Sequence, residues 1–132
     1  MSKPTRGRIK GHRYVRLHDP IFRATHWVFF GPSRTFGAVA PAIVGATIDP
    51  LPEGVAGTCA AMQHAGESVS TLTHVSSDLA RFEHLETLIH ELHHAMVYTL
   101  DASNVPMTRD TGELMAYYHE WLVREGRKGV GL

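Results

Sequence analysis

The sequence predicts an α+β protein, in which a small antiparallel or mixed sheet is followed by two helices. In the first half, short segments rich in β-branched and aromatic residues are separated by Gly and Pro, a pattern typical of strands. After residue 78, apolar residues recur at intervals of three and four, which indicates amphipathic helices. Strands followed by helices are typical of α+β folds, and 132 residues are the usual length of one domain.

The expected strands share a high β propensity and end at Gly, Pro or polar clusters. They are the segments 13–17, 24–30, 35–48, 58–64 and 68–75. The segment 35–48 consists mostly of small and apolar residues and contains Gly37 and Pro41, so it is expected to hold one strand or two fragments. Residues 49–54 have the composition of a loop, and residues 65–67 are expected to join the last two strands.

Two helices are expected to follow, at residues 79–100 and 111–125. Ser76, Ser77 and Asp78 form a cluster typical of a helix N-cap, which places the start of the first helix at residue 79. Pro106 prevents that helix from continuing, and Gly126 is the expected end of the second helix.

Charge is balanced overall but unevenly distributed along the chain. The formal net charge is zero, yet six Lys and Arg residues precede the first acid, Asp19. We expect residues 1–12 to form a loose basic arm and residues 13–132 to form a single domain. A more specific alternative is that the arm contacts nucleic acid or an acidic partner.

The composition also bears on the compartment. A single cysteine, Cys59, rules out a disulfide within the chain, as is usual in a reducing compartment. The N-terminus lacks the apolar segment of a signal peptide, and the longest apolar stretch is too short to span a membrane. We therefore expect a cytoplasmic protein, or a virion-associated one if the chain is encoded by a phage, with no membrane partner.

The most informative motif is His90-Glu91-Leu92-His93-His94, an HExxH sequence within the first expected helix. Residues four apart lie on the same helix face, so His90 and His94 can direct two imidazoles at one Zn²⁺ ion. Glu91 lies about 100° around the helix from His90, beside the metal, where it could take a proton from a water that the zinc polarises. The motif predicts a zinc site.

A catalytic zinc site usually has a third protein ligand, and Glu113 is the best candidate. It lies near the start of the second expected helix, which follows the first and could pack against it. An alternative role is a capping box, in which Asp110 is the N-cap and Glu113 the third helical residue.

These residues resemble the gluzincin clan of zinc metallopeptidases, which pair HExxH on one helix with a glutamate from the next. The similarity covers about the last 55 residues and is greatest to small gluzincin-like proteins of bacteria and their phages. The resemblance implies a zincin-like fold in which His90, His94 and Glu113 bind zinc and Glu91 is the general base. It also implies that the strand before the metal helix, here 68–75, pairs with the peptide substrate.

Two further residues of the helices, Tyr117 and His93, each have two alternative roles. A peptidase needs a donor for the oxyanion of its intermediate, and Tyr117, one turn after Glu113, is the first candidate. A place in the core between the helices is the alternative for this tyrosine. His93 is expected either at the surface or beside the metal ligands, and the remaining histidines show no paired spacing.

The sequence thus predicts a zinc-dependent metallohydrolase, a peptidase that acts on peptide or protein substrates. The second hypothesis is a non-catalytic module stabilised by zinc, such as a phage virion or assembly protein, because metal binding can supply folding energy. A third alternative is a protein without metal, whose histidines lie on a solvated helix surface.

Overall fold

The computed structural model describes residues 3–48, 51, 54–62 and 69–132. The strands are β1 (Thr5–Ile9), β2 (His12–Asp19), β3 (Ala24–Gly31), β4 (Gly57–Met62) and β5 (Val69–Ser76). The helices are α1 (Ser33–Val44), α2 (Glu83–Ala102) and α3 (Gly112–Val130), and a short 3₁₀ turn, η1 (Arg109–Thr111), precedes α3.

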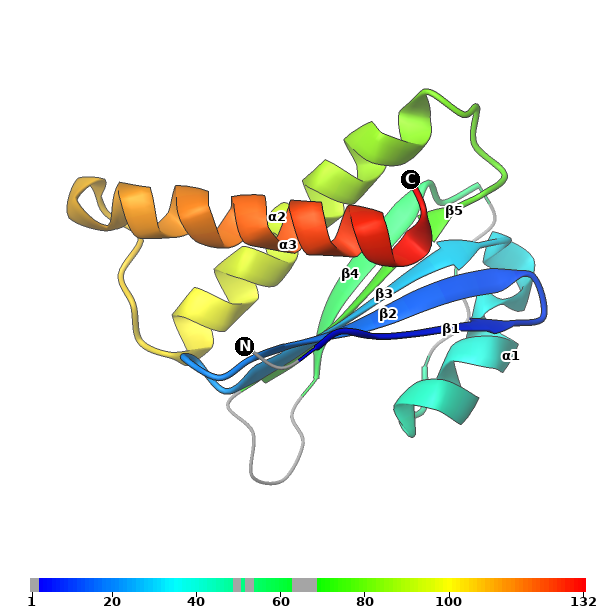
Figure 1. Ribbon diagram of the computed structural model, residues 1–132, viewed down its shortest axis with the longest axis horizontal. Coiled ribbons are helices and arrows are strands. Elements are labelled where there is room, and N and C mark those ends of the chain that lie inside the picture. The colour runs from blue at the N-terminus through cyan, green and yellow to red at the C-terminus, as the bar shows by residue number, and fades with distance from the viewer. Residues whose placement is uncertain (1–2, 49–50, 52–53, 63–68) are drawn as a thin grey trace.

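The strands form one five-stranded sheet in the order β1-β2-β3-β5-β4. Of the four strand pairs in the described residues, β3–β5 is parallel and the other three are antiparallel. Helices α2 and α3 cover one face of the sheet and α1 covers the other (Figure 1). The predicted α+β class and mixed sheet are confirmed, with one additional strand and one additional helix.

The first additional element is β1, which lies where a loose arm was expected. It pairs with β2 from Thr5↔Arg16 to Ile9↔His12, so these residues belong to the sheet. Lys10 (φ 44°) and Gly11 (φ 84°) connect the two strands, and positive φ at both positions is the geometry of a two-residue type I′ hairpin. The sequence of β1 does not predict a strand, because arginines stand where a typical strand has alternating apolar residues.

The second additional element is α1, and the expectation of one or two strands at residues 35–48 is wrong. Phe36, Val39 and Ala40 have the spacing of one helix face, and all three are buried. Phe36 stacks on His74 of β5, with ring centroids 4.2 Å apart. This packing outweighs the low helix propensity of Gly37 and Pro41, which lie within the helix.

Helix α2 begins at Glu83, four residues after the expected start. Asp78, the expected cap, instead accepts a hydrogen bond from the backbone N–H of Ser33 (3.2 Å) and one from the Ser76 hydroxyl (3.3 Å). Its carboxylate therefore lies at the N-terminus of α1, where the helix dipole favours negative charge. The cap predicted for α2 thus serves a different helix.

Helices α2 and α3 bury a continuous apolar core against the sheet. The buried residues of α2 are Leu88, Leu92, Ala95, Met96 and Leu100, and α3 adds Tyr118, Leu122 and Val130. Helix α3 continues past Gly126, where it was expected to stop. A Cβ atom at Gly126 would lie 3.2 Å from Leu92 and 3.6 Å from Val28, so glycine lets the helix lie close to α2 and the sheet.

A buried chain of polar groups also holds α3 to the sheet. The Tyr118 hydroxyl donates to Asp19 (2.9 Å), so its oxygen accepts from His26 Nε2 (2.8 Å). His26 Nδ1 then accepts from the Thr71 hydroxyl (2.7 Å). Each polar group of this network has a hydrogen-bond partner, which makes the network stabilising in a low-dielectric interior. The helices of the described residues include none long and apolar enough to cross a membrane.

Buried histidines make the stability of the fold dependent on pH, and His26 and His74 have the largest shifts in pKa. Burial lowers the pKa of His26 to about 3 and that of His74 to about 4, whereas both have a pKa of 6.5 when unfolded. Below pH 6.5 these two histidines therefore bind more protons in the unfolded chain than in the folded chain. We expect the free energy of unfolding to fall by up to about 1.4 kcal/mol per histidine for each pH unit below 6.5.

Urea unfolding at several pH values between about 7 and 5 measures this slope. The matched variant is His74→Gln, whose amide can still donate to the Gly31 carbonyl that His74 Nε2 contacts at 3.1 Å. We expect a shallower slope in this variant, because one titrating group is lost. An equal slope in the parent protein and in His74→Gln would show that His74 does not contribute to the pH dependence.

Candidate functional site

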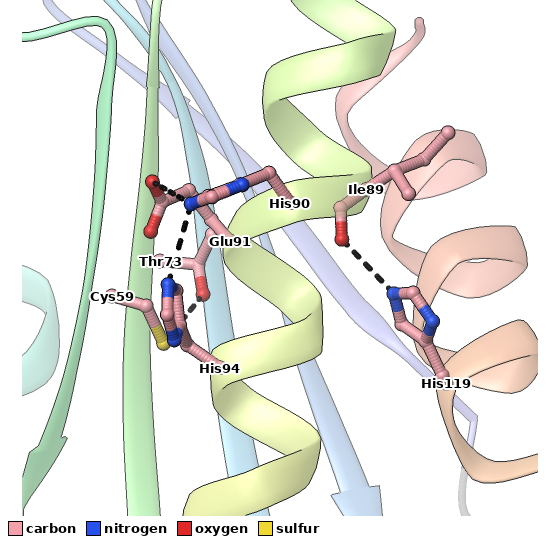
Figure 2. A network of polar contacts seen from close by, with 7 residues as sticks. All are labelled: Cys59, Thr73, Ile89, His90, Glu91, His94 and His119. Atoms are coloured by element: carbon pink, nitrogen blue, oxygen red, sulfur yellow. Dashed lines mark hydrogen bonds and ion pairs between the residues drawn. The ribbon is translucent and has the colours of Figure 1, made fainter. Parts of the chain in front are cut away.

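The apolar side of α2 fixes the direction of its HExxH residues. Because each residue turns the helix by about 100°, Glu91 lies at one border of the buried apolar side of α2 and Ile89 lies at the other. His90 and His94 lie farther from the stripe, on the side of α2 that faces β4 and β5 (Figure 2). Both are exposed, and the His90 side chain is 69% accessible.

His90 and His94 bring their Nε2 atoms to 3.3 Å from each other. Two ligands on one tetrahedral zinc, each with a Zn–N bond of 2.0–2.1 Å, lie about 3.3 Å apart. The separation also allows an N–H···N hydrogen bond when one ring carries its proton on Nε2. The expected convergence of the two imidazoles is present, and its geometry fits a zinc ion.

Glu91 extends from α2 toward the sheet, beside the two imidazoles. Its carboxylate lies 4.0 Å from His90 Nε2, and its side chain is only 12% exposed. Burial raises the pKa of Glu91 above its ordinary value, and the imidazoles of His90 and His94 partly offset this effect. A carboxylate with a raised pKa, at the edge of a polar cluster, suits general acid–base chemistry.

Strand β4 approaches α2 closely because residue 57 has no side chain. A Cβ atom at Gly57 would lie 2.6 Å from Thr87, 2.9 Å from the His74 carbonyl oxygen and 3.1 Å from Glu91. Sequence reasoning missed this contact, because nothing near the motif in the chain indicates it. Gly57 leaves the space that Glu91 occupies between the helix and the edge of the sheet.

Cys59 lies on the same face of β4, near Glu91. Its thiol accepts a hydrogen bond from the Thr73 hydroxyl (3.4 Å; Figure 2). Burial raises the pKa of Cys59 to about 12, and the nearby Glu91 carboxylate adds to the shift. The thiol is therefore protonated near neutral pH, which argues against a nucleophilic role.

Glu113 lies exposed in the first turn of α3. Its alternative role as part of a capping box is wrong, because the box is formed by Thr108 and Thr111, with Thr108 N–H donating to Thr111 Oγ1 (2.9 Å). Asp110 likewise is not the N-cap. Within the described part of the chain, the Glu113 side chain makes no hydrogen bond or ion pair.

The structure does not bring Glu113 into one cluster with the histidine pair. Among the described residues, no group of three or more His, Cys, Asp or Glu side chains is arranged to hold a metal ion. The cause lies in how α3 packs: His119 of α3 donates from Nε2 to the Ile89 carbonyl oxygen (2.9 Å), on the other side of α2 from the pair (Figure 2). The site thus consists of two histidines and Glu91.

The structure also places the tyrosines and His93, which is exposed as one of its two expected positions required. Tyr117 is 66% exposed, so its alternative place in the core between the helices is wrong, and its role as an oxyanion donor stays a prediction. Tyr98, one turn after His94, has its ring 6.5 Å from the His94 ring and is the tyrosine in contact with the pair. His93 is exposed and contacts His119 across α2 and α3, with ring centroids 5.5 Å apart.

The strand expected to pair with a substrate is β5, and this expectation is wrong. Both edges of β5 are occupied, by β3 on one side and by β4 on the other. Strand β4 is the edge of the sheet next to α2. Among the described strands, the one with an unpaired edge beside the histidine pair is therefore β4, which precedes β5 in the chain.

Comparison of the chain with protein-family models, with curated proteins and with solved structures finds no match.

The close approach at Gly57 can be tested by Gly57→Ala. The added methyl group meets the His74 backbone and Thr87, so we expect the free energy of unfolding to fall by about 1–3 kcal/mol. The control is Gly112→Ala, where a Cβ atom meets nothing within 4 Å and the helical φ of −58° suits alanine. That change should raise stability by up to about 1 kcal/mol. Equal stabilities for the parent and Gly57→Ala would contradict the account of the contact.

Proposed function

We propose that this protein is a zinc-dependent metallohydrolase that cleaves peptide bonds. The observation that carries the proposal is the 3.3 Å separation of the Nε2 atoms of His90 and His94, together with the largely buried Glu91 carboxylate beside them. The geometry supports zinc binding by the pair, because the separation equals that of two ligands on a tetrahedral ion. Bound zinc would supply a Lewis acid that polarises water and the substrate carbonyl.

Glu91 acts as the general base in this proposal. Its carboxylate accepts a proton from the attacking water and returns it to the amine that leaves when the peptide bond breaks. Burial raises the pKa of Glu91, which makes the carboxylate a better proton acceptor. A Cβ atom at Gly57 would lie 3.1 Å from the Glu91 side chain, so Glu91 lies close to β4 as well as to the pair.

The open edge of β4 offers a way to hold an extended peptide. Backbone N–H and C=O groups at a sheet edge can pair with an added strand, which provides affinity without a deep pocket. Gly57 and Cys59 of β4 lie next to Glu91, so a peptide paired along this edge passes the proposed base. This arrangement supports a peptide substrate over a small molecule.

A structural role for the metal is less favoured. Structural zinc stabilises a fold by joining separate segments of the chain. His90 and His94 belong to the same helix, and α2 is already held by its buried apolar side. Zinc on this pair therefore adds little to the folding energy, and its removal should leave the fold intact.

The first test combines metal analysis with proteolysis of labelled casein. We expect zinc in the purified protein, loss of zinc in His94→Ala, and retained zinc in His93→Ala, whose ring faces α3. Glu91→Gln should keep zinc but lose hydrolysis by about 10²-fold or more, because general base catalysis contributes that much. Unchanged hydrolysis in Glu91→Gln would refute the mechanism, and unfolding on chelation would favour the zinc-stabilised module.

The second test concerns the third ligand. We propose that the free Glu113 carboxylate completes the site when the start of α3 moves toward the pair. Glu113→Gln should then weaken zinc binding by more than about 100-fold, since even outer partners of a metal site contribute 10–100-fold. The control is Glu120→Gln, another exposed carboxylate of α3. Equal zinc affinities for the two variants would show that Glu113 is not a ligand.

A further inference from the structure

Positive charge gathers at the end of the molecule formed by the β1–β2 hairpin and the end of α3. Four of its residues line a hollow of about 350 Å³: Arg6, Arg8, Arg13 and Lys128. Arg8 and Arg13 also line an adjoining hollow, which Lys10 extends to the tip of the hairpin. We call these five residues the basic hairpin surface.

The strand register places the three arginines on one face of the sheet. Arg8 pairs with Arg13, and Arg6 pairs with Val15, and cross-strand partners project from the same face. This is the face covered by α3, because a Cβ atom at Gly129 would overlap Val15. The hairpin and the end of α3 thus bring cations from two distant segments together.

The cations of this surface have few local partners. Among the described residues, no acidic side chain lines either hollow. Lys128 is paired with Glu125 at 3.8 Å, and both are partly exposed, so this ion pair is weak. The Arg13 guanidinium lies 4.9 Å above the Phe30 ring, a contact that orients the group without neutralising it.

We propose that the basic hairpin surface binds the phosphodiester backbone of nucleic acid. Arginine matches the geometry of phosphate oxygens, and a site lined by cations and glycines suits a polyanion better than a neutral ligand. The overall charge of the protein is zero, so this attraction is local. The contact depends on the charge of the phosphates and does not distinguish one base from another.

An acidic protein is the less favoured occupant. Protein interfaces depend on buried aromatic or aliphatic anchors, whereas interfaces with nucleic acid are more polar and more positively charged. None of the large, exposed apolar side chains of the described residues lies in the hairpin or at the end of α3: they are Ile21, Phe82, Ile89, Tyr98, Met107, Leu114 and Tyr117. An apolar hollow that Ile89 lines adjoins the surface at Lys128, but the hairpin itself offers charge without an apolar anchor.

The test measures binding of the full chain to labelled duplex DNA, single-stranded DNA and single-stranded RNA by fluorescence anisotropy. For a duplex, the logarithm of the affinity should fall with the logarithm of the salt concentration by about 0.9 per engaged cation. Arg6→Gln with Arg8→Gln should reduce this slope by about 1.8, and Lys128→Gln alone by about 0.9. The control removes the same charge elsewhere, through Arg34→Gln with Arg81→Gln, and should leave the slope unchanged.

Three results would overturn the proposal. The first is no binding to any of the nucleic acids at about 50 mM salt, where electrostatic affinity is high. The second is an equal loss in the control double variant, which would indicate a general charge effect. The third is equal or stronger binding to poly-glutamate, which would assign the surface to an acidic protein. Melting temperatures of all variants confirm that each is folded, and Lys128→Gln tests the proposal through a different element from the hairpin.

Discussion

The burial of one side of α2 against the sheet determines where every group of the candidate site lies. Leu88, Leu92 and Met96 fix the rotation of the helix about its axis. Glu91 is then left at the border that meets β4, and the histidine pair lies outside it. A rotation of α2 by one residue position, about 100°, would bury an imidazole or expose the carboxylate. The chemistry proposed for the site therefore depends on ordinary apolar packing.

The parts of the fold that local pattern determines could be predicted from the sequence. The strands β2, β3, β4 and β5 and the two long helices have clear propensities, and the turn of His90 toward His94 follows from helix geometry alone. The helix α1 could not be predicted, because Gly37 and Pro41 hide its buried face. Gly57 could not be associated with Glu91, because their contact arises only when distant segments pack. The position of Glu113 depends on how α3 crosses α2, which no local spacing specifies.

Six of the ten histidines fall into a buried group and an exposed group. His12, His26 and His74 are buried, and burial lowers the pKa of each, so they act as neutral hydrogen-bonding groups of the core. His90, His93 and His94 are exposed on α2, where solvent and ions can reach them. Abundant histidine therefore signals two different physical roles in one small fold.

The two edges of the sheet differ in how they resist unwanted association. An open edge strand is a template for another chain, and charged side chains are a common protection against it. Strand β1 carries Arg6 and Arg8, whereas β4 has the uncharged sequence Gly-Thr-Cys-Ala-Ala-Met. When concentrated, this protein should therefore self-associate through β4 rather than β1, joining two sheets edge to edge and hiding Glu91 at the junction.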